Sequence, residues 1–122
     1  MTVKYFAKPQ KDFTIVKGRH DEIPFIIYKD SSLTERKDIT YDALLFVVRV
    51  KWDRLEIVFE LSTDMGIEKT NPLQGECKLL ISPTESDQDP GAYVAELLLI
   101  EPSEEKYAIW VSAFDIKYEV AG

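Results

Sequence analysis

The sequence predicts an all-β protein in which short antiparallel strands pack as a two-layered sandwich. Three observations support this fold class. Apolar side chains recur at alternate positions along most of the chain, whereas helical periodicity is nearly absent. The alternating segments are short and repeat at roughly 8–15 residues. Glycine, proline, asparagine and aspartate stand between them, where a chain of short strands needs turns.

The first two strands are predicted before residue 28. One lies around Phe13 and Ile15 and ends before Gly18, and the second covers residues 22–27. Pro24 has no backbone N–H to donate to a neighbouring strand. The second strand therefore begins at this proline or lies at the edge of a sheet.

The middle of the chain alternates polar connections with strands. A polar connection over residues 29–42 precedes a strand over residues 44–50, whose first half is apolar on both faces and therefore central in a sheet. Residues 51–54 carry a turn. Residues 54–61 then show the clearest alternation of apolar and charged side chains, which predicts a half-buried strand. A second polar connection covers residues 62–74.

Three further strands are predicted over residues 76–81, 93–100 and 107–113, and we expect Trp110 of the last one to lie in the core. Alternation continues through residues 114–120, which predicts that the last strand is long, bent or bulged. About seven strands at this spacing indicate an antiparallel β-sandwich of immunoglobulin-like kind. The Cys–Trp–Cys spacing of antibody domains is absent, which excludes that subclass.

One short helical turn is predicted between the fifth and sixth strands. Ser82 is a suitable N-cap, Pro83 suits the first helical position, and Glu85 stands three residues after the cap, as in a capping box. The turn should run from Pro83 to about Gln88. The Asp-Pro-Gly sequence at 89–91 then ends it and starts the next strand.

The same acidic stretch shares some features with a calcium-binding loop. Asp87, Asp89 and Gly91 stand at alternate positions, like the first ligands of an EF-hand loop. The pattern then fails, because Ala92 stands where the loop needs glycine and Leu98 where it needs glutamate. We therefore predict no metal site and no cofactor.

Length and charge limit the organisation and the partners. The 122 residues suit one domain, predicted over residues 12–122, with residues 1–11 as an N-terminal extension that could dock on a partner. The net charge of −7 argues against nucleic acid or an anionic membrane as a partner. The run Ala43–Val48 is too short to span a bilayer. Cys77 is the single cysteine, so the chain cannot form an internal disulfide.

No catalytic residues are predicted. His20 is the only histidine and lacks partners for a triad or a metal site, so we expect it on the surface. Cys77 lies on an apolar strand face, where free cysteine is usually a buried hydrophobe. We therefore expect a protein that is not an enzyme. Trp52 at a turn, with Tyr5 and Phe6 in the extension, are the candidate contacts with a partner.

Four segments resemble a family of phage virion proteins: small immunoglobulin-like domains of tail and baseplate components, including the N-terminal domain of siphophage upper-baseplate proteins. The segments are Asp12–Gly18, Glu22–Phe25, Asp38–Ala43 and Asp89–Leu97. The last contains the Pro-Gly-x-Tyr strand start of the family, after a short helical turn. A glycine that often precedes the tyrosine of the third segment is missing before Tyr41.

The resemblance implies a non-enzymatic structural or interaction protein of a phage or prophage particle, in the tail or baseplate or decorating the particle. Its implied partners are other virion proteins, or further copies in a homo-oligomer. Its implied location is the virion, assembled in the cytoplasm of a bacterial host. The alternative is a β-sandwich module that binds carbohydrate or protein through Trp52 and nearby aromatic residues.

Overall fold

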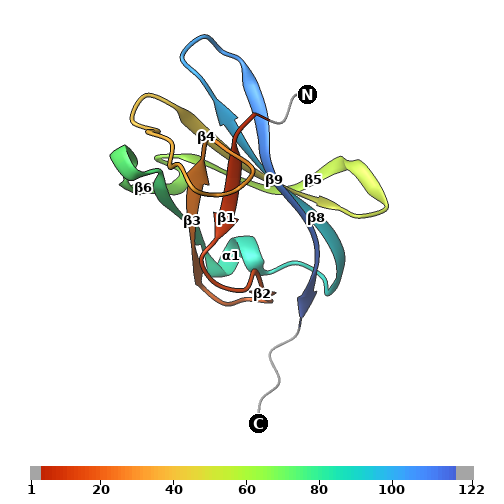
Figure 1. Ribbon diagram of the computed structural model, residues 1–122. Helices are drawn as coiled ribbons and strands as arrows, with labels where there is room; N and C mark the ends of the chain where they lie inside the picture. Colours follow the sequence, from red (N-terminus) through yellow and green to blue (C-terminus); the bar gives the residue numbers. More distant parts are fainter. Residues whose placement is uncertain (1–3, 118–122) are drawn as a thin grey trace.

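The structure, a computed structural model that describes residues 4–117, is built of strands with two short helical segments (Figure 1). The strands are β1 (Phe6–Pro9), β2 (Ile15–Val16), β3 (Asp21–Tyr28), β4 (Ala43–Val50), β5 (Asp53–Thr63), β6 (Gly66–Asn71), β7 (Glu76–Ile81), β8 (Gly91–Ile100) and β9 (Lys106–Lys117). The helical segments are η1 (Pro72–Gln74) and α1 (Pro83–Ser86). No helix within residues 4–117 has the length and apolar character needed to cross a membrane.

All described strands belong to one mixed sheet in the order β1-β3-β7-β6-β5-β4-β8-β9-β2. Neighbours are antiparallel except for β2 beside β9 and β5 beside β6, which are parallel. The two strands at the ends of this order, β1 and β2, follow each other in the chain. The sheet therefore curls into a half-barrel whose two ends approach each other (Figure 1).

The all-β prediction is confirmed, but the strand number and the pairing differ from it. The structure has nine strands where about seven were expected, and its pairing is mixed where an antiparallel arrangement was expected. One added strand, β6, lies in the predicted polar connection 62–74, where Ile67 is the only buried hydrophobic residue. A strand with one buried position gives almost no alternation to detect.

The other added strand comes from the predicted N-terminal extension. Phe6–Pro9 forms β1, which pairs with β3 from Phe6 opposite Tyr28 to Pro9 opposite Phe25. Tyr5 precedes it and donates a hydrogen bond from its hydroxyl to Glu101 Oε2 at 3.2 Å. This part of residues 1–11 thus belongs to the curled sheet.

Aromatic side chains join the two halves of the curled sheet across the core. Trp110 of β9 lies 5.1 Å from Phe25 of β3 and 4.9 Å from Phe13, ring centroid to ring centroid. Phe46 of β4 stacks on Trp110 with ring centroids 6.5 Å apart. Trp110 is partly buried and packs against the core, so the prediction that it is a core residue is correct only in part. Cys77 is also buried as expected, and burial raises the pKa of its thiol to about 12.

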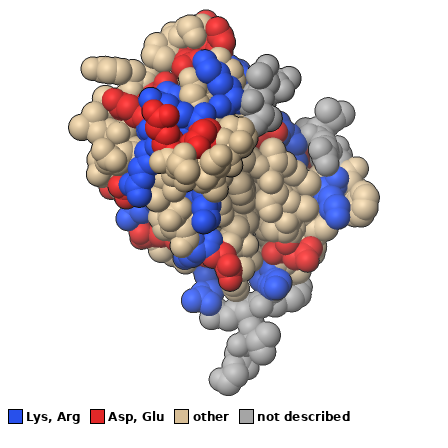
Figure 2. Space-filling view, in the orientation of Figure 1, with Lys and Arg blue, Asp and Glu red and all other residues tan. Residues whose placement is uncertain are grey.

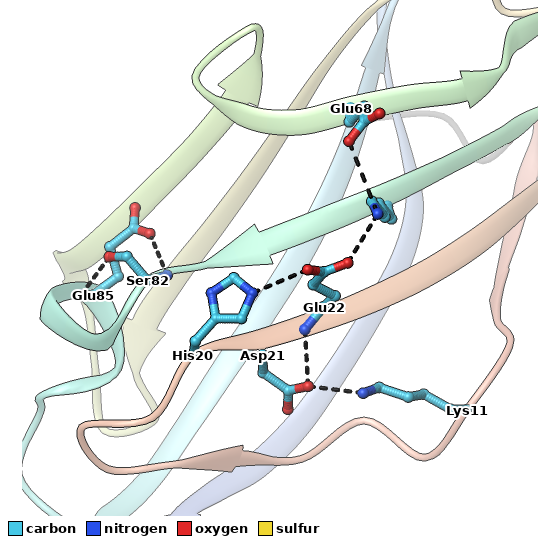
Figure 3. A network of polar contacts seen from close by, with 8 residues as sticks. Lys11, His20, Asp21, Glu22, Glu68, Ser82 and Glu85 are labelled. Carbon is cyan, nitrogen blue, oxygen red and sulfur yellow. Dashed lines mark hydrogen bonds and ion pairs between the residues drawn. The ribbon is translucent and has the colours of Figure 1, made fainter.

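The predicted helical turn is confirmed as α1, between β7 and β8. Ser82 Oγ accepts a hydrogen bond from the Glu85 N–H at 3.1 Å, and Glu85 Oε1 accepts one from the Ser82 N–H at 2.9 Å (Figure 3). This is the reciprocal capping box that the sequence predicts. Ser86 is fully buried and donates its hydroxyl hydrogen bond to the Arg19 carbonyl at 2.7 Å.

Candidate interaction surfaces

Trp52 lies at the turn between β4 and β5, where it is 84% exposed. The hairpin formed by these strands extends away from the rest of the sheet (Figure 1). Lys51 Nζ lies 5.1 Å from the centroid of the Trp52 ring, and the Lys51 N–H donates to the Ala92 carbonyl at 3.1 Å. An exposed indole beside an ammonium group offers a large apolar surface to a partner protein or a sugar ring.

Tyr5 and Phe6 lie at the opposite end of the sheet from Trp52. Tyr5 contacts Tyr107 edge-on with ring centroids 5.4 Å apart, and Tyr107 pairs with Leu99 near the C-terminal end of β8. Trp52 follows Val50, which pairs with Tyr93 near the N-terminal end of β8. Both Tyr5 and Phe6 are half-buried. The structure therefore brings Tyr5 and Phe6 together but separates them from Trp52.

A pocket of about 480 Å³ lies beside Tyr5, lined by Lys4, Tyr5, Lys29, Lys37 and Asp38. Lys37 Nζ lies 4.7 Å above the Tyr5 ring and forms an ion pair with Asp42 Oδ2 at 2.7 Å. Lys29 faces Glu35 at 3.4 Å. Two of the three lysines thus have carboxylate partners within the chain, so the pocket lacks the free positive charge of a strong anion site.

The outer face of β3, β7 and β6 carries a row of paired charges (Figure 3). His20 Nε2 lies 3.1 Å from Glu22 Oε2, and Lys78 Nζ lies 2.8 Å from Glu22 Oε1 and 3.9 Å from Glu68. The hydrogen bonds from Lys78 and His20 hold the pKa of the Glu22 carboxyl at about 2. His20 is exposed as predicted, and its neighbours make it part of a surface ion cluster.

No group of three or more His, Cys, Asp or Glu side chains within residues 4–117 could hold a metal ion. The acidic stretch after β7 has structural roles instead. Glu85 closes the capping box, and Asp87 forms an ion pair with Lys17 at 2.9 Å. Asp89 accepts a hydrogen bond at its carbonyl from the Tyr93 hydroxyl.

The outer face of β5, β4, β8 and β9, here called the β4–β8 outer face, is different in character. The strand register gives its apolar members as Ala43, Leu45, Val47, Ile57, Val94, Leu98, Ile100, Ala108, Val111 and Ala113. Val111 is 56% exposed and Ile57 is 46% exposed. The sequence predicts a strand over residues 44–50 whose first half is apolar on both faces, but it does not predict that these residues share a surface with β5, β8 and β9.

Charged residues stand among and beside these apolar side chains, including Lys106 opposite Ile100 and Asp115 opposite Ala92. Glu60, Val47, Glu96 and Val111 form one row across the four strands, and Arg49 stands in the next row. In the part of the chain that the structure describes, Arg49, Glu60 and Glu96 make no ion pair and no side-chain hydrogen bond. On the face seen in Figure 2, lysines and arginines lie among acidic residues, with uncharged areas between them.

Comparison with known proteins gives likeness only at the level of the fold. No family model and no curated protein matches this chain. A polysaccharide deacetylase from Bacillus cereus is 11% identical with a TM-score of 0.49, over 92% of this chain and 30% of the deacetylase. A family 76 glycoside hydrolase from a bovine Bacteroides thetaiotaomicron strain is 13% identical with a TM-score of 0.50, over 89% of this chain and 20% of the hydrolase.

A third similar structure is AggA, the major subunit of aggregative adherence fimbriae type I from Escherichia coli. It is 11% identical with a TM-score of 0.39, over 97% of this chain and 95% of the subunit. The chain thus spans less than a third of the deacetylase and of the hydrolase. At 13% identity the likeness to the hydrolase concerns the fold alone and carries no residue roles.

Proposed function

We propose that this protein is a non-enzymatic structural or interaction component of a phage or prophage particle, in the tail or baseplate or as a decoration. It acts through protein–protein contacts, with other virion proteins or with copies of itself. The observation that carries the proposal is the exposure of large apolar side chains, above all Trp52 at the turn between β4 and β5, at 84%, and Val111 on β9, at 56%. Exposed apolar surface of this kind is typical of interaction sites.

The immunoglobulin-like assignment is part of the same proposal. In this proposal the two parts of the single sheet, β1-β3-β7-β6 and β5-β4-β8-β9-β2, are the counterparts of the two sheets of such a sandwich and are joined through β5 and β6. The Tyr93 hydroxyl donates to the Asp89 carbonyl at the start of β8, as in the tyrosine corner of these domains. This contact lies in the segment Asp89–Leu97, which also carries the phage resemblance.

Particle purification tests the virion role. Particles induced from a host that encodes this chain should contain it in stoichiometric amount by quantitative mass spectrometry. Its absence from purified particles, with the protein present in the lysate, would refute the proposal.

Point variants test whether Trp52 makes the contact. Trp52→Ala should reduce incorporation into particles, whereas Tyr41→Ala, which removes an equally exposed aromatic residue, should not. Deletion of residues 1–11 is a poor test, because it removes β1 and uncovers the edge of β3. Equal incorporation of the Trp52 and Tyr41 variants would exclude Trp52 as a virion contact.

The second candidate function is carbohydrate binding, which the exposure of Trp52 beside Lys51 favours. An indole face can stack on a sugar ring. A glycan array should then show binding by the wild type that Trp52→Ala loses. Absence of binding by the wild type would exclude this function.

A further inference from the structure

We infer that the β4–β8 outer face binds a second copy of this chain, so that two molecules form a symmetric, face-to-face dimer. The inference rests on the proposed function as a protein that acts through protein–protein contacts, and it names one partner. Three properties of the surface support it: its contrast with the other outer face, its size and its charge pattern.

The contrast between the two outer faces of the curled sheet is the first property. On the outer face of β3, β7 and β6, charged side chains pair with one another through Glu22, Lys78 and Glu68. On the β4–β8 outer face, Val111 and Ile57 stand exposed beside unpaired charges. An antiparallel sheet that faces water on one side usually alternates polar residues outward. The β4–β8 outer face departs from that pattern, as expected for a covered surface.

The size of the surface suits a dimer interface. Four strands spaced about 4.8 Å apart, over eight residues rising about 3.4 Å each, give a face of roughly 19 by 27 Å. The flat product is roughly 500 Å², whereas stable interfaces bury about 800 Å² on each partner, so residues around this face would supply the rest of the interface. Within the face, Val47 and Leu98 are already buried at 2% and 7% exposure, and Val111 and Ile57 supply exposed apolar surface.

The charge pattern makes the surface complementary to itself. Arg49 stands in the row next to Glu60 and Glu96, and all three lack partners within the described chain. In a two-fold symmetric interface the same surface is used on both molecules. Each Arg49 can then pair with an acidic residue of the other copy, and Glu96 is the nearer to the centre of the face because it lies between Val47 and Val111.

Light scattering coupled to size exclusion tests the dimer with the full chain. The wild type should be dimeric in the micromolar range, and Val111→Lys should raise the dissociation constant at least about tenfold by placing a charge between apolar surfaces. Leu73→Lys is the matched control, because Leu73 is 67% exposed and lies in η1, outside this face. Circular dichroism should show that both variants remain folded.

Charge exchange tests the pairing. Arg49→Glu and Glu96→Arg should each weaken the dimer roughly tenfold, whereas the double variant should return to within about threefold of wild type. A wild type that is monomeric at all concentrations overturns the inference, as does a dimer that is insensitive to Val111→Lys. A monomer that is nevertheless found in particles would overturn only the dimer and leave the proposed function standing.

Discussion

The buried ion pair between Lys37 and Asp42 should be one of the most sensitive points in the fold. Lys37 is 9% exposed and Asp42 is 6% exposed, with 2.7 Å between Nζ and Oδ2. Lys37 Nζ also donates to the Asp38 carbonyl at 3.2 Å, and the Lys37 N–H donates to the Ile27 carbonyl at 2.9 Å. The pair therefore fastens the long connection between β3 and β4 to the sheet.

Removal of one partner should be far more damaging than removal of both. Lys37→Met leaves the Asp42 carboxylate buried without its partner, and such a change costs about 3–5 kcal/mol of unfolding free energy. A chain of this length is stabilised by roughly 6–18 kcal/mol, so Lys37→Met should still fold but melt roughly 10–20 °C lower. The double variant Lys37→Met/Asp42→Leu should lie within about 1 kcal/mol of wild type, since apolar residues can replace a buried pair.

Urea denaturation followed by tryptophan fluorescence gives these free energies, with Trp110 as the core reporter. The matched control is Lys29→Met, which removes a lysine from the exposed pair with Glu35 on the same connection and should cost less than about 1 kcal/mol. A loss below about 1 kcal/mol for Lys37→Met, or a double variant as unstable as the sum of the single variants, would refute the reasoning.

Three further predictions concern other parts of the fold. Ser82→Ala removes the cap of α1 and should lower the unfolding free energy by about 1 kcal/mol, whereas Thr84→Ala in the same turn should have little effect in the same urea titration. The Cys77 thiol, buried and with its pKa raised to about 12, should resist iodoacetamide at pH 8 in buffer and react fully in denaturant; labelling at equal rates in both would contradict its burial. The pKa of Glu22 is held at about 2 in the fold against 4.5 for the free group, so its stabilising effect is present above pH 4.5 and is lost as the pH falls towards 2. Lys78→Ala should therefore reduce the acid-induced loss of stability between these pH values, and an unchanged acid denaturation curve would show that the pairing has no effect on stability.

The sequence predicted those elements whose signal is local. Ser82, Pro83 and Glu85 specify their capped turn by direct contacts within four residues, and the structure has it there. Strands β3, β4, β7 and β8 each bury alternate side chains, so their periodicity was visible. In β5 the register shifts beside Arg49, yet enough alternation remains to identify the strand.

The missed features depend on contacts between distant residues. β6 buries only Ile67, and β1 is four residues long with none of them fully buried, so neither can be recognised without its neighbour in the sheet. The parallel pairing of β2 with β9 places Ile15 opposite Ile116, two residues that lie far apart in the sequence. The row of Glu60, Val47, Glu96 and Val111 exists only once three strand registers are fixed, which explains why the candidate interface could not be predicted from any single segment.

The short stretch from β1 to β2 has a consequence for how the protein folds. It leaves one end of the sheet, where β1 pairs with β3, and joins the other end, where β2 pairs with β9. Closure at β2 must wait until β9 has been synthesised, because β9 is its partner, and pairings between segments far apart in the sequence form slowly. Until β9 is synthesised, the sheet should have a free edge along β8, and Phe13 cannot yet pack on Trp110 and Phe114. Pairing of β2 with β9, and not formation of the hairpins, would then limit the rate at which fully folded molecules appear.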